Sequence, residues 1–415
     1  MKAAIVGFGR AGYGAAKALR RQAPDAIIHV YSKTGEAPGN PMLTSYYAQN
    51  RVDDEGIYPL GDLESICRDL NLVFRATPVL RLDPHTKTVF CQDGTQECYD
   101  TVLVATGAVP LVPKSLLAPG YEPFVLRTYG DMRRIKAYLE NNPIKEAVVV
   151  GCSWVGIKIV EVLHARDVHV TMVDAAGWIF PTAAYRDVAE KIHQNLRDMG
   201  IELIFDAPVA KTDETGVTLG DGRFLPSDFT CLSIGIRPDL GVFAENSPEV
   251  GRGIVVNERM ESSIPGIFAA GDCCEVYNPQ TDKRAMIGLW AAADAQGTCA
   301  GINMAGGYAE YPGEIPHNIT HFFDMDFVGM GDPTLPGRRH SFCSAHSTVE
   351  AVTAENGKLQ SINILQGYRV AGFLKNHLTK QLWGAPAALS PRQKGQLLAE
   401  GYSREFIDYI GGDRA

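Results

Sequence analysis

Short apolar segments alternate with longer amphipathic ones along the first three quarters of this chain. Apolar runs rich in valine and isoleucine predict the buried strands of a parallel sheet, and they occupy residues 3–6, 26–31, 100–105, 146–150 and 168–173. Helical spacing of apolar residues follows at 11–21, 154–166, 185–199 and 289–304. This alternation of strands and helices predicts an α/β fold with parallel sheets.

A glycine motif joins the first strand to the first helix. Gly7 allows a tight turn, Gly9 allows the backbone to approach a pyrophosphate, and Gly12 lets the helix pack closely on the strand. The free N–H groups at the start of the helix then face the phosphate charge. The motif predicts a dinucleotide-binding fold.

The same pattern returns in the middle of the chain. Gly151, Ser153, Val155 and Gly156 follow a strand of their own and open a second helix. A later apolar run ends in Gly271-Asp272, and there we expect the chain to re-enter the first fold. We therefore expect two Rossmann-like domains, the second inserted in the first.

The character of the sequence changes near residue 308. Strands are predicted at 327–330, 347–353 and 359–365, with Asn356-Gly357 as a hairpin turn, and helices follow from Ser390 onwards. This pattern predicts an α+β C-terminal interface domain. The expected domains are residues 1–112 with 240–307, residues 113–239 inserted between them, and residues 308–415.

Composition narrows the class of protein. The net charge of −9 speaks against nucleic acids and anionic membrane surfaces as partners, and no apolar run is long enough to span a membrane. The 9 cysteines are scattered without any C-x-x-C pair, so we expect reduced thiols and no metal site. These features predict a cytoplasmic protein.

Five motifs follow one another along the chain, and they are Gly7-x-Gly9-x-x-Gly12, Ala105-Thr106-Gly107, Gly151-x-Ser153-x-x-Gly156, Gly235-Ile236-Arg237-Pro238 and Gly271-Asp272. Together they resemble the motifs of one enzyme superfamily, the FAD/NAD(P)-dependent pyridine nucleotide-disulfide oxidoreductases. Within it, the pattern is similar to the reductases that resemble the flavin portion of NADH nitrite reductase and rubredoxin reductase. The resemblance implies an NADH:acceptor oxidoreductase with FAD and NAD(H) as cofactors.

The resemblance also implies which residues contact FAD. They surround its pyrophosphate, its ribityl chain, its adenine and the edge of its flavin ring, and they are Gly7, Gly9, Gly12, Pro41, Val79, Ala105, Thr106, Gly107, Asp272 and Trp290. For Trp290, an aromatic residue of the core is an equally good interpretation.

The chain departs from the family pattern near the first fold. Residues 36–46 contain no cysteine, so a thiol relay beside the flavin is not expected. The acid that normally binds the adenosine ribose is also missing. Applied to Gly7, the 23-residue distance from Gly151 to Asp174 leads to Val30, and Glu36 is only a distant substitute.

The second fold keeps its acid. Asp174 follows the strand 168–173 and is placed to bond the 2′-hydroxyl of NAD, whereas no cation at 175 or 176 would balance a 2′-phosphate. We therefore expect NADH rather than NADPH. Gly235 completes the NAD contacts that the resemblance implies. Lys158 stands where the family often has glutamate, and it is either a catalytic cation beside the flavin or a lysine on a solvated helix face.

The electron acceptor is the open question. Apolar residues near the C-terminus suggest docking on another protein or on a neighbouring copy, and the alternative is that they pack on their own chain. They are Leu397, Leu398, Phe406, Ile407, Tyr409 and Ile410. We expect an electron-carrier protein or the catalytic subunits of a multisubunit complex as the partner. The alternatives are direct reduction of a small molecule, oxygen or peroxide, and a structural flavoprotein subunit with negligible turnover.

Overall fold

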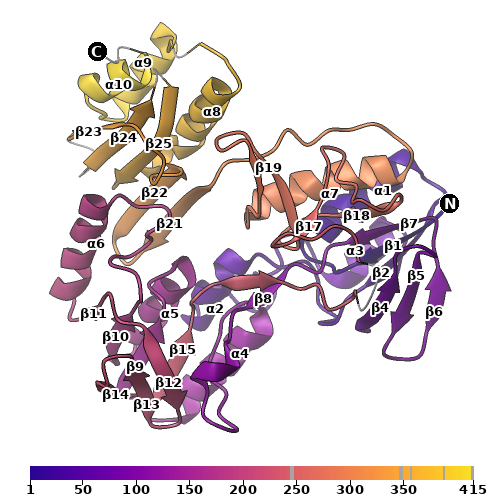
Figure 1. Ribbon diagram of the computed structural model, residues 1–415, viewed down its shortest axis with the longest axis horizontal. Helices are drawn as coiled ribbons and strands as arrows, with labels where there is room; N and C mark the ends of the chain where they lie inside the picture. The colour runs from indigo at the N-terminus through magenta and orange to yellow at the C-terminus, as the bar shows by residue number, and fades with distance from the viewer. Residues whose placement is uncertain (244–246, 345–348, 356–357, 387, 413–415) are drawn as a thin grey trace. The chain divides into compact units, whose positions relative to one another are not determined.

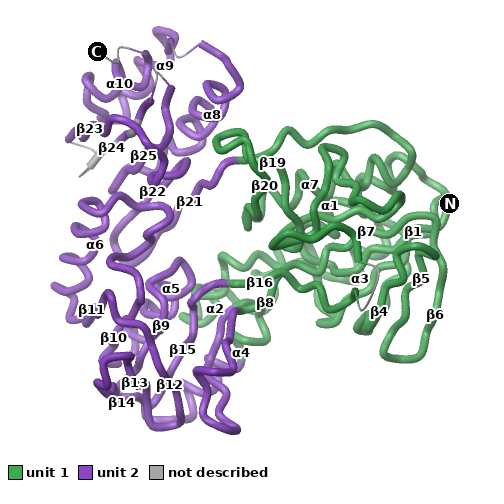
Figure 2. The backbone as a smooth tube through the Cα atoms, viewed as in Figure 1, with its two compact units in different colours: residues 1–110, 127–133, 236–314 green, residues 111–126, 134–235, 315–415 purple. Residues whose placement is uncertain are grey.

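The computed structural model describes residues 1–243, 247–344, 349–355, 358–386 and 388–412. The chain forms two compact units, each built from three segments (Figure 2). The first unit contains residues 1–110, 127–133 and 236–314, and the second contains residues 111–126, 134–235 and 315–415. The domain boundaries predicted at 112, 239 and 307 lie near these limits and stay a prediction.

A parallel sheet forms the centre of the first unit. Its order is β18-β7-β1-β2-β3, and its strands are β1 (Lys2–Val6), β2 (Ile27–Tyr31), β3 (Leu72–Arg75), β7 (Thr101–Val104) and β18 (Ile267–Ala269). β18 comes from the far side of the insertion, so the sheet is completed by a distant part of the sequence. The predicted α/β class with an inserted second fold is confirmed.

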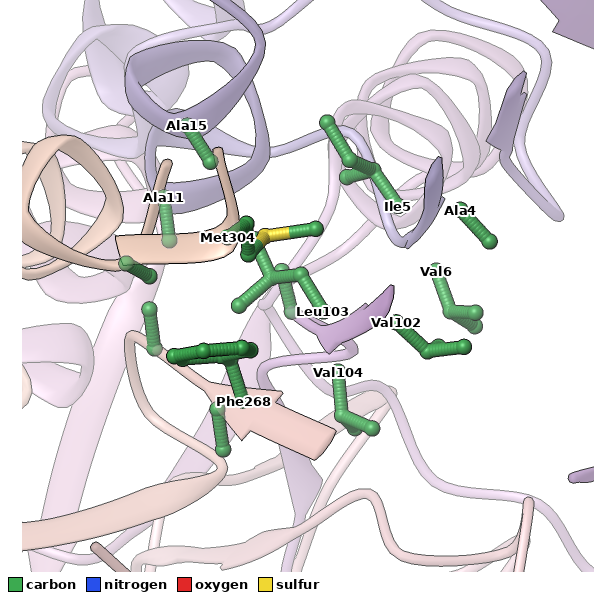
Figure 3. Packing of buried hydrophobic residues seen from close by; sticks show 14 of the residues in the cluster. Ala4, Ile5, Val6, Ala11, Ala15, Val102, Leu103, Val104, Phe268 and Met304 are labelled. Carbon is green, nitrogen blue, oxygen red and sulfur yellow. The ribbon is translucent and has the colours of Figure 1, made fainter. Parts of the chain in front are cut away.

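Two helices of the first unit pack against each other with little space between them. They are α1 (Arg10–Gln22) and α7 (Trp290–Met304) (Figure 1). A Cβ added to Gly297 would lie 2.0 Å from the Ala11 carbonyl oxygen, which shows how closely the backbones approach. Figure 3 shows Ala11 and Ala15 beside Met304, with Leu103 and Phe268 next to them in the buried core.

Smaller elements complete the first unit. They are β4 (Val79–Asp83), β5 (Thr88–Cys91), β6 (Gln96–Cys98), β8 (Ala108–Pro110), β16 (Ile236–Pro238), β17 (Ile254–Val255), β19 (Cys274–Asn278), β20 (Lys283–Ala285), η1 (Pro41–Leu43), α2 (Thr44–Ala48) and α3 (Leu63–Asp69). β5 and β6 pair antiparallel on either side of the turn predicted at Asp93-Gly94.

The second unit begins with another parallel sheet, of order β11-β10-β9-β15. Its strands and the elements around them are β9 (Glu146–Val150), β10 (His169–Val173), β11 (Glu202–Ile204), β15 (Phe229–Leu232), β12 (Val209–Asp213), β13 (Gly216–Leu219), β14 (Phe224–Pro226), η2 (Lys114–Leu116), α5 (Trp154–His164) and α6 (Arg186–Asp198). α4 (Tyr129–Asn141) begins in the first unit and ends in the second.

The C-terminal part of the second unit is an antiparallel sheet with helices, as predicted. Its order is β21-β22-β25-β24-β23. The elements are β21 (His317–Phe322), β22 (Met325–Gly331), β23 (Arg338–Phe342), β24 (Val349–Glu355), β25 (Lys358–Leu365), η3 (Tyr368–Val370), α8 (Ala371–Leu382), α9 (Pro391–Ala399) and α10 (Arg404–Ile410). The turn predicted at Asn356-Gly357, and residues 347–348 of the predicted strand, lie outside the described residues.

The apolar residues near the C-terminus are buried within their own domain. Leu397, Phe406, Ile407 and Ile410 are at most 1 % exposed and pack in one cluster with strands β22, β24 and β25, and Tyr409 belongs to the same cluster. Leu398 is exposed. The expectation that these residues form a docking surface is therefore wrong, because five of the six are buried in the core of their own domain.

The described residues show no sign of a membrane span or a metal site. None of the described helices is both long enough and apolar enough to cross a membrane. No group of three or more His, Cys, Asp and Glu side chains within the described ranges is arranged to hold a metal ion.

Candidate functional site

The three glycines of the first motif have different surroundings. A Cβ on Gly7 would lie 2.2 Å from the Ala105 carbonyl oxygen, and a Cβ on Gly12 would lie 2.2 Å from that of Gly7. Around Gly9 there is no protein atom within 4 Å of such a Cβ. Gly7 and Gly12 are thus required by packing, whereas Gly9 leaves an open place that fits the FAD pyrophosphate at the start of α1.

Buried donors without acceptors lie at the starts of α1 and α7. Nε and Nη1 of Arg10 and Nε1 of Trp290 are buried, and none has a hydrogen-bond partner among the described residues. The Arg10 guanidinium lies 4.2 Å from the Trp290 ring centroid, and its Nη2 is 3.1 Å from Asp294. Unpaired donors of this kind are costly, and they fit a ligand rich in phosphate and carbonyl oxygens such as FAD.

Asp272 has a cationic partner that the sequence did not reveal. Arg127 Nη2 donates to its Oδ2 at 2.6 Å, and the same nitrogen lies 3.8 Å from the position of a Cβ on Gly107. Arg127 therefore joins two predicted FAD motifs. Thr106 is fixed nearby, because its Oγ1 donates to the Asp239 carbonyl at 2.6 Å.

The segment that carries Arg127 is held by the start of α4. The Asp131 carboxylate accepts from the backbone N–H groups of Arg127 at 3.0 Å and of Thr128 at 2.7 Å. Thr128-x-x-Asp131 is a sequence signal for a helix start, and it could have revealed this helix. It could not have revealed the partner of Arg127, which lies 145 residues away.

The loop before α2 contains Pro41. Asn40 Oδ1 accepts from the Met42 N–H at 3.1 Å, and the Asn40 carbonyl accepts from the Tyr129 hydroxyl at 2.5 Å. Glu36, at the start of the loop, is bound by Arg133 at 2.5 Å. Glu36 is thus engaged elsewhere, which removes the reason to regard it as a substitute for the missing ribose acid.

The end of β2 corrects the counted position of that acid. Val6 pairs with Tyr31, as Val150 pairs with Val173, and Gly7 N donates to Tyr31 O at 2.8 Å as Gly151 N donates to Val173 O at 2.7 Å. The counterpart of Asp174 is therefore Ser32, not Val30. The count failed because α1 has 13 residues and α5 has 11.

The second motif is built like the first with one change. A Cβ on Gly151 would lie 2.5 Å from the Ser233 carbonyl oxygen, and one on Gly156 would lie 2.2 Å from that of Gly151. Ser153 replaces the middle glycine, and its Oγ accepts from the Gly156 N–H at 3.1 Å as the cap of α5.

Asp174 lies at the end of β10, as predicted. Its Oδ2 accepts from the Cys152 N–H at 2.6 Å and its Oδ1 from the Ala176 N–H at 2.8 Å. The carboxylate thus stands beside the turn of the second motif. The remaining predicted NAD residues lie in the second unit too: Val155 is the second residue of α5, and Gly235 has a φ of +124°.

Lys158 has protein partners within the second unit. Its Nζ donates to Glu161 Oε2 at 2.7 Å and to the His321 carbonyl oxygen, and Glu161 Oε1 accepts from the Phe323 N–H at 2.8 Å. These bonds connect α5 to the turn after β21. They favour the structural interpretation of Lys158, and a catalytic role stays a prediction.

The thiols near the FAD motifs are poorly suited to redox chemistry. Cys273 and Cys274 directly follow Asp272 and are buried. Burial raises the pKa of Cys273 to about 11 and raises the pKa of Cys274 well above its usual value. Because the thiolate is the reactive form, burial and a raised pKa both disfavour redox reactions of these two cysteines.

The predicted FAD residues gather in one unit. Val79 begins β4, and Ala105 lies under Gly7 after β7. Arg10, Arg127 and Ser32 are candidate residues that the sequence analysis did not identify.

Known proteins resemble this chain over most of its length. The family model described as pyridine nucleotide-disulphide oxidoreductase matches residues 1–297. The chain is 28% identical over 397 residues to an NADH oxidase of Methanocaldococcus jannaschii, covering 89% of each chain. It is 28% identical over 344 residues to the epsilon subunit of an NADH-dependent phenylglyoxylate dehydrogenase of Aromatoleum evansii, covering 80% of this chain and 79% of that one.

A solved structure has the same fold. The chain aligns with the covalent complex of putidaredoxin reductase and putidaredoxin at a TM-score of 0.85 and 20% identity, covering 100% of this chain and 99% of that one. The family match extends over both nucleotide-binding motifs and the return through Gly271-Asp272. The chain therefore belongs to the pyridine nucleotide-disulphide oxidoreductase family, and it is an NADH-dependent oxidoreductase with FAD and NAD(H) as its cofactors.

Proposed function

We propose that this chain exchanges electrons between NAD(H) and a partner protein. The partner is an iron–sulfur or rubredoxin-like carrier, or the catalytic subunits of a multisubunit enzyme. The observation that carries the proposal is the lack of a usable thiol: the first cysteine of the sequence is Cys67, well after the loop that contains Pro41. A disulfide or persulfide substrate therefore has no thiol relay there.

The cofactor-binding residues have distinct tasks in this proposal. Gly9 and the start of α1 would hold the FAD pyrophosphate. Asp272, which Arg127 holds in place, would accept a hydrogen bond from a hydroxyl of the ribityl chain. Asp174 selects the ribose of NADH in the second unit. When bound, FAD takes up a hydride from the nicotinamide and releases electrons one at a time or in pairs.

The relatives support a protein acceptor. One of them is named as a subunit of a dehydrogenase, and the structural neighbour is a reductase in a covalent complex with its redox protein. Of the six apolar residues predicted to dock near the C-terminus, five are buried in the core of their own domain, so they add no support for a protein acceptor.

Direct reduction of oxygen is the second candidate function. It is favoured by the relative from Methanocaldococcus jannaschii, which is named an NADH oxidase. The two functions differ in what the isolated chain can do without a partner.

Steady-state assays of the isolated chain with NADH distinguish these functions. We expect rapid reduction of viologen or quinone dyes and slow turnover with oxygen, peroxide and disulfides. A kcat of about 1 to 1000 per second with oxygen, peroxide or a disulfide would contradict the proposal. Negligible turnover with every acceptor would indicate a structural subunit instead.

A further inference from the structure

We infer that the Ser32 hydroxyl binds the adenosine ribose of FAD, in place of the carboxylate found in the second fold. The inference rests on the FAD assignment made above. It concerns the end of β2, where the two folds of this chain share backbone geometry but differ in side chains.

The backbone equivalence of the two folds places Ser32. The motif glycine bonds the last residue of the second strand in both folds, at 2.8 Å in the first and 2.7 Å in the second. The next residue is Ser32 in one fold and Asp174 in the other. A ligand that enters both folds in the same way meets these two side chains with the same part of its structure.

The neighbours of Ser32 are engaged elsewhere. Tyr31 is buried, and its hydroxyl bonds that of Tyr99. Lys33 Nζ is 2.7 Å from Asp239 Oδ2, and Glu36 is bound by Arg133. Ser32 Oγ has a single weak contact at 3.2 Å, with Thr34 Oγ1. A hydroxyl can both donate and accept, so it can exchange this contact for one with a ribose hydroxyl.

The replacement of a carboxylate by a hydroxyl at this position also changes the hydrogen bonding of the glycine-motif turn. In the second fold Asp174 accepts from the Cys152 N–H at 2.6 Å. The corresponding N–H of Phe8 has no hydrogen-bond partner among the described residues. The Ser32 hydroxyl contacts Thr34 Oγ1 and not this N–H, so the donor stays available to FAD. A neutral hydroxyl also binds more weakly than a carboxylate. The adenosine end of FAD is therefore held less tightly than a carboxylate would hold it.

The test measures FAD binding to the FAD-free chain by quenching of flavin fluorescence. Ser32→Ala should weaken FAD binding about fivefold, and Ser32→Asp should strengthen it by a similar factor. An FAD analogue with 2′,3′-dideoxyadenosine should bind the unaltered chain about fivefold more weakly than FAD does. The Ser32→Ala chain should not distinguish the two ligands. Asp174→Ala is the matched control, since it should weaken NADH binding and leave FAD binding unchanged.

Two results would overturn the inference. One is equal FAD affinity of the Ser32→Ala and unaltered chains, and the other is equal affinity of the unaltered chain for FAD and the analogue. The analogue needs no variant, so it decides the question even if Ser32→Ala fails to fold. If the unaltered chain binds no FAD at all, the proposed function fails together with the inference, and this result is distinct from the other two.

Discussion

The two nucleotide-binding folds of this chain depart from the dinucleotide-binding motif at different positions. The first fold keeps the open middle glycine, Gly9, but has Ser32 at the ribose position. The second keeps the ribose acid, Asp174, but has Ser153 at the middle position. In the proposed assignment, each fold thus retains one of the two contacts with its nucleotide. A cofactor that stays bound needs the phosphate cradle most, whereas one that must be selected and released depends on the ribose contact.

The largest expected effect comes from closing the cradle. Gly9→Val should reduce FAD affinity at least about 100-fold, because its side chain would fill the place of the pyrophosphate. The chain should still fold, since no protein atom lies within 4 Å of the added Cβ. Absorbance of the purified protein near 450 nm measures the FAD content.

Gly395→Ala is the control for Gly9→Val. Gly395 lies in α9, and a Cβ there also meets no atom within 4 Å. This variant should retain all of its FAD. A yellow Gly9→Val protein with one FAD per chain would contradict the role of Gly9 in binding the FAD pyrophosphate.

The next effect concerns the ribose acid of the second fold. We expect a kcat/KM for NADH at least about tenfold higher than for NADPH, and Asp174→Ala should abolish this ratio. The preference arises because the carboxylate repels a 2′-phosphate. Equal values for the two nucleotides in the unaltered chain would contradict the assigned role of Asp174.

A third prediction concerns the pH dependence of stability. It arises from a charge network that is present in the first fold and has no counterpart at Leu225 in the second. Glu97 accepts from Tyr99 at 2.9 Å, lies 2.9 Å from His29 and bonds Lys2, whereas the corresponding strand of the second fold has Leu225. Burial opposes the charge of Glu97, but its bonds to Lys2 and Tyr99 outweigh this and lower its pKa to about 2. Burial also lowers the pKa of His29.

Both shifts predict that acid destabilises the first fold. Each folded pKa lies below its unfolded value, so each contribution is complete above the unfolded pKa and is lost as the pH falls towards the folded one. For His29 the loss starts near pH 6.5, and for Glu97 it extends from pH 4.5 to about 2. Glu97→Gln should lower the free energy of unfolding at pH 7 by about 2 kcal/mol and flatten its decrease below pH 4.5. Denaturant titrations at several pH values measure the free energy of unfolding. If Glu97→Gln left its pH dependence unchanged, Glu97 would not be a source of the acid destabilisation.

The smallest effect is expected at Lys158. Lys158→Ala should leave the rate of flavin reduction by NADH within about twofold, because the ammonium is occupied by Glu161 and the His321 carbonyl. Stopped-flow absorbance measures this rate. A decrease of tenfold or more would instead give the second fold a catalytic cation.

The sequence predicted most of the fold and only part of the site. The two glycine motifs and the apolar strands after which they stand are local signals, so they could be read directly. Ser32 was missed because a helix longer by two residues changes a distance along the chain without changing the register of the sheet. Arg127 was missed because its partner is distant in sequence.

Two errors concern the C-terminal domain. The first is that strands β21 and β23 were not predicted. β23 begins with Arg338 and Arg339, and β21 contains two histidines, so neither edge strand has the apolar alternation of a buried one. The apolar character of Leu397 and Phe406 was plain, but composition alone does not distinguish a residue of the chain's own core from one at an interface.

The path of the chain at Arg127 has a practical consequence for protein engineering. Residues 127–133 belong to the first unit although the stretches on both sides of them belong to the second. A shortened protein made by joining residue 110 to residue 236 would therefore lack the arginine that pairs with Asp272. Such a shortened protein would need residues 127–133 grafted back, so that Asp272 keeps its cationic partner. The same holds for any chimera that exchanges the inserted fold for one from another protein.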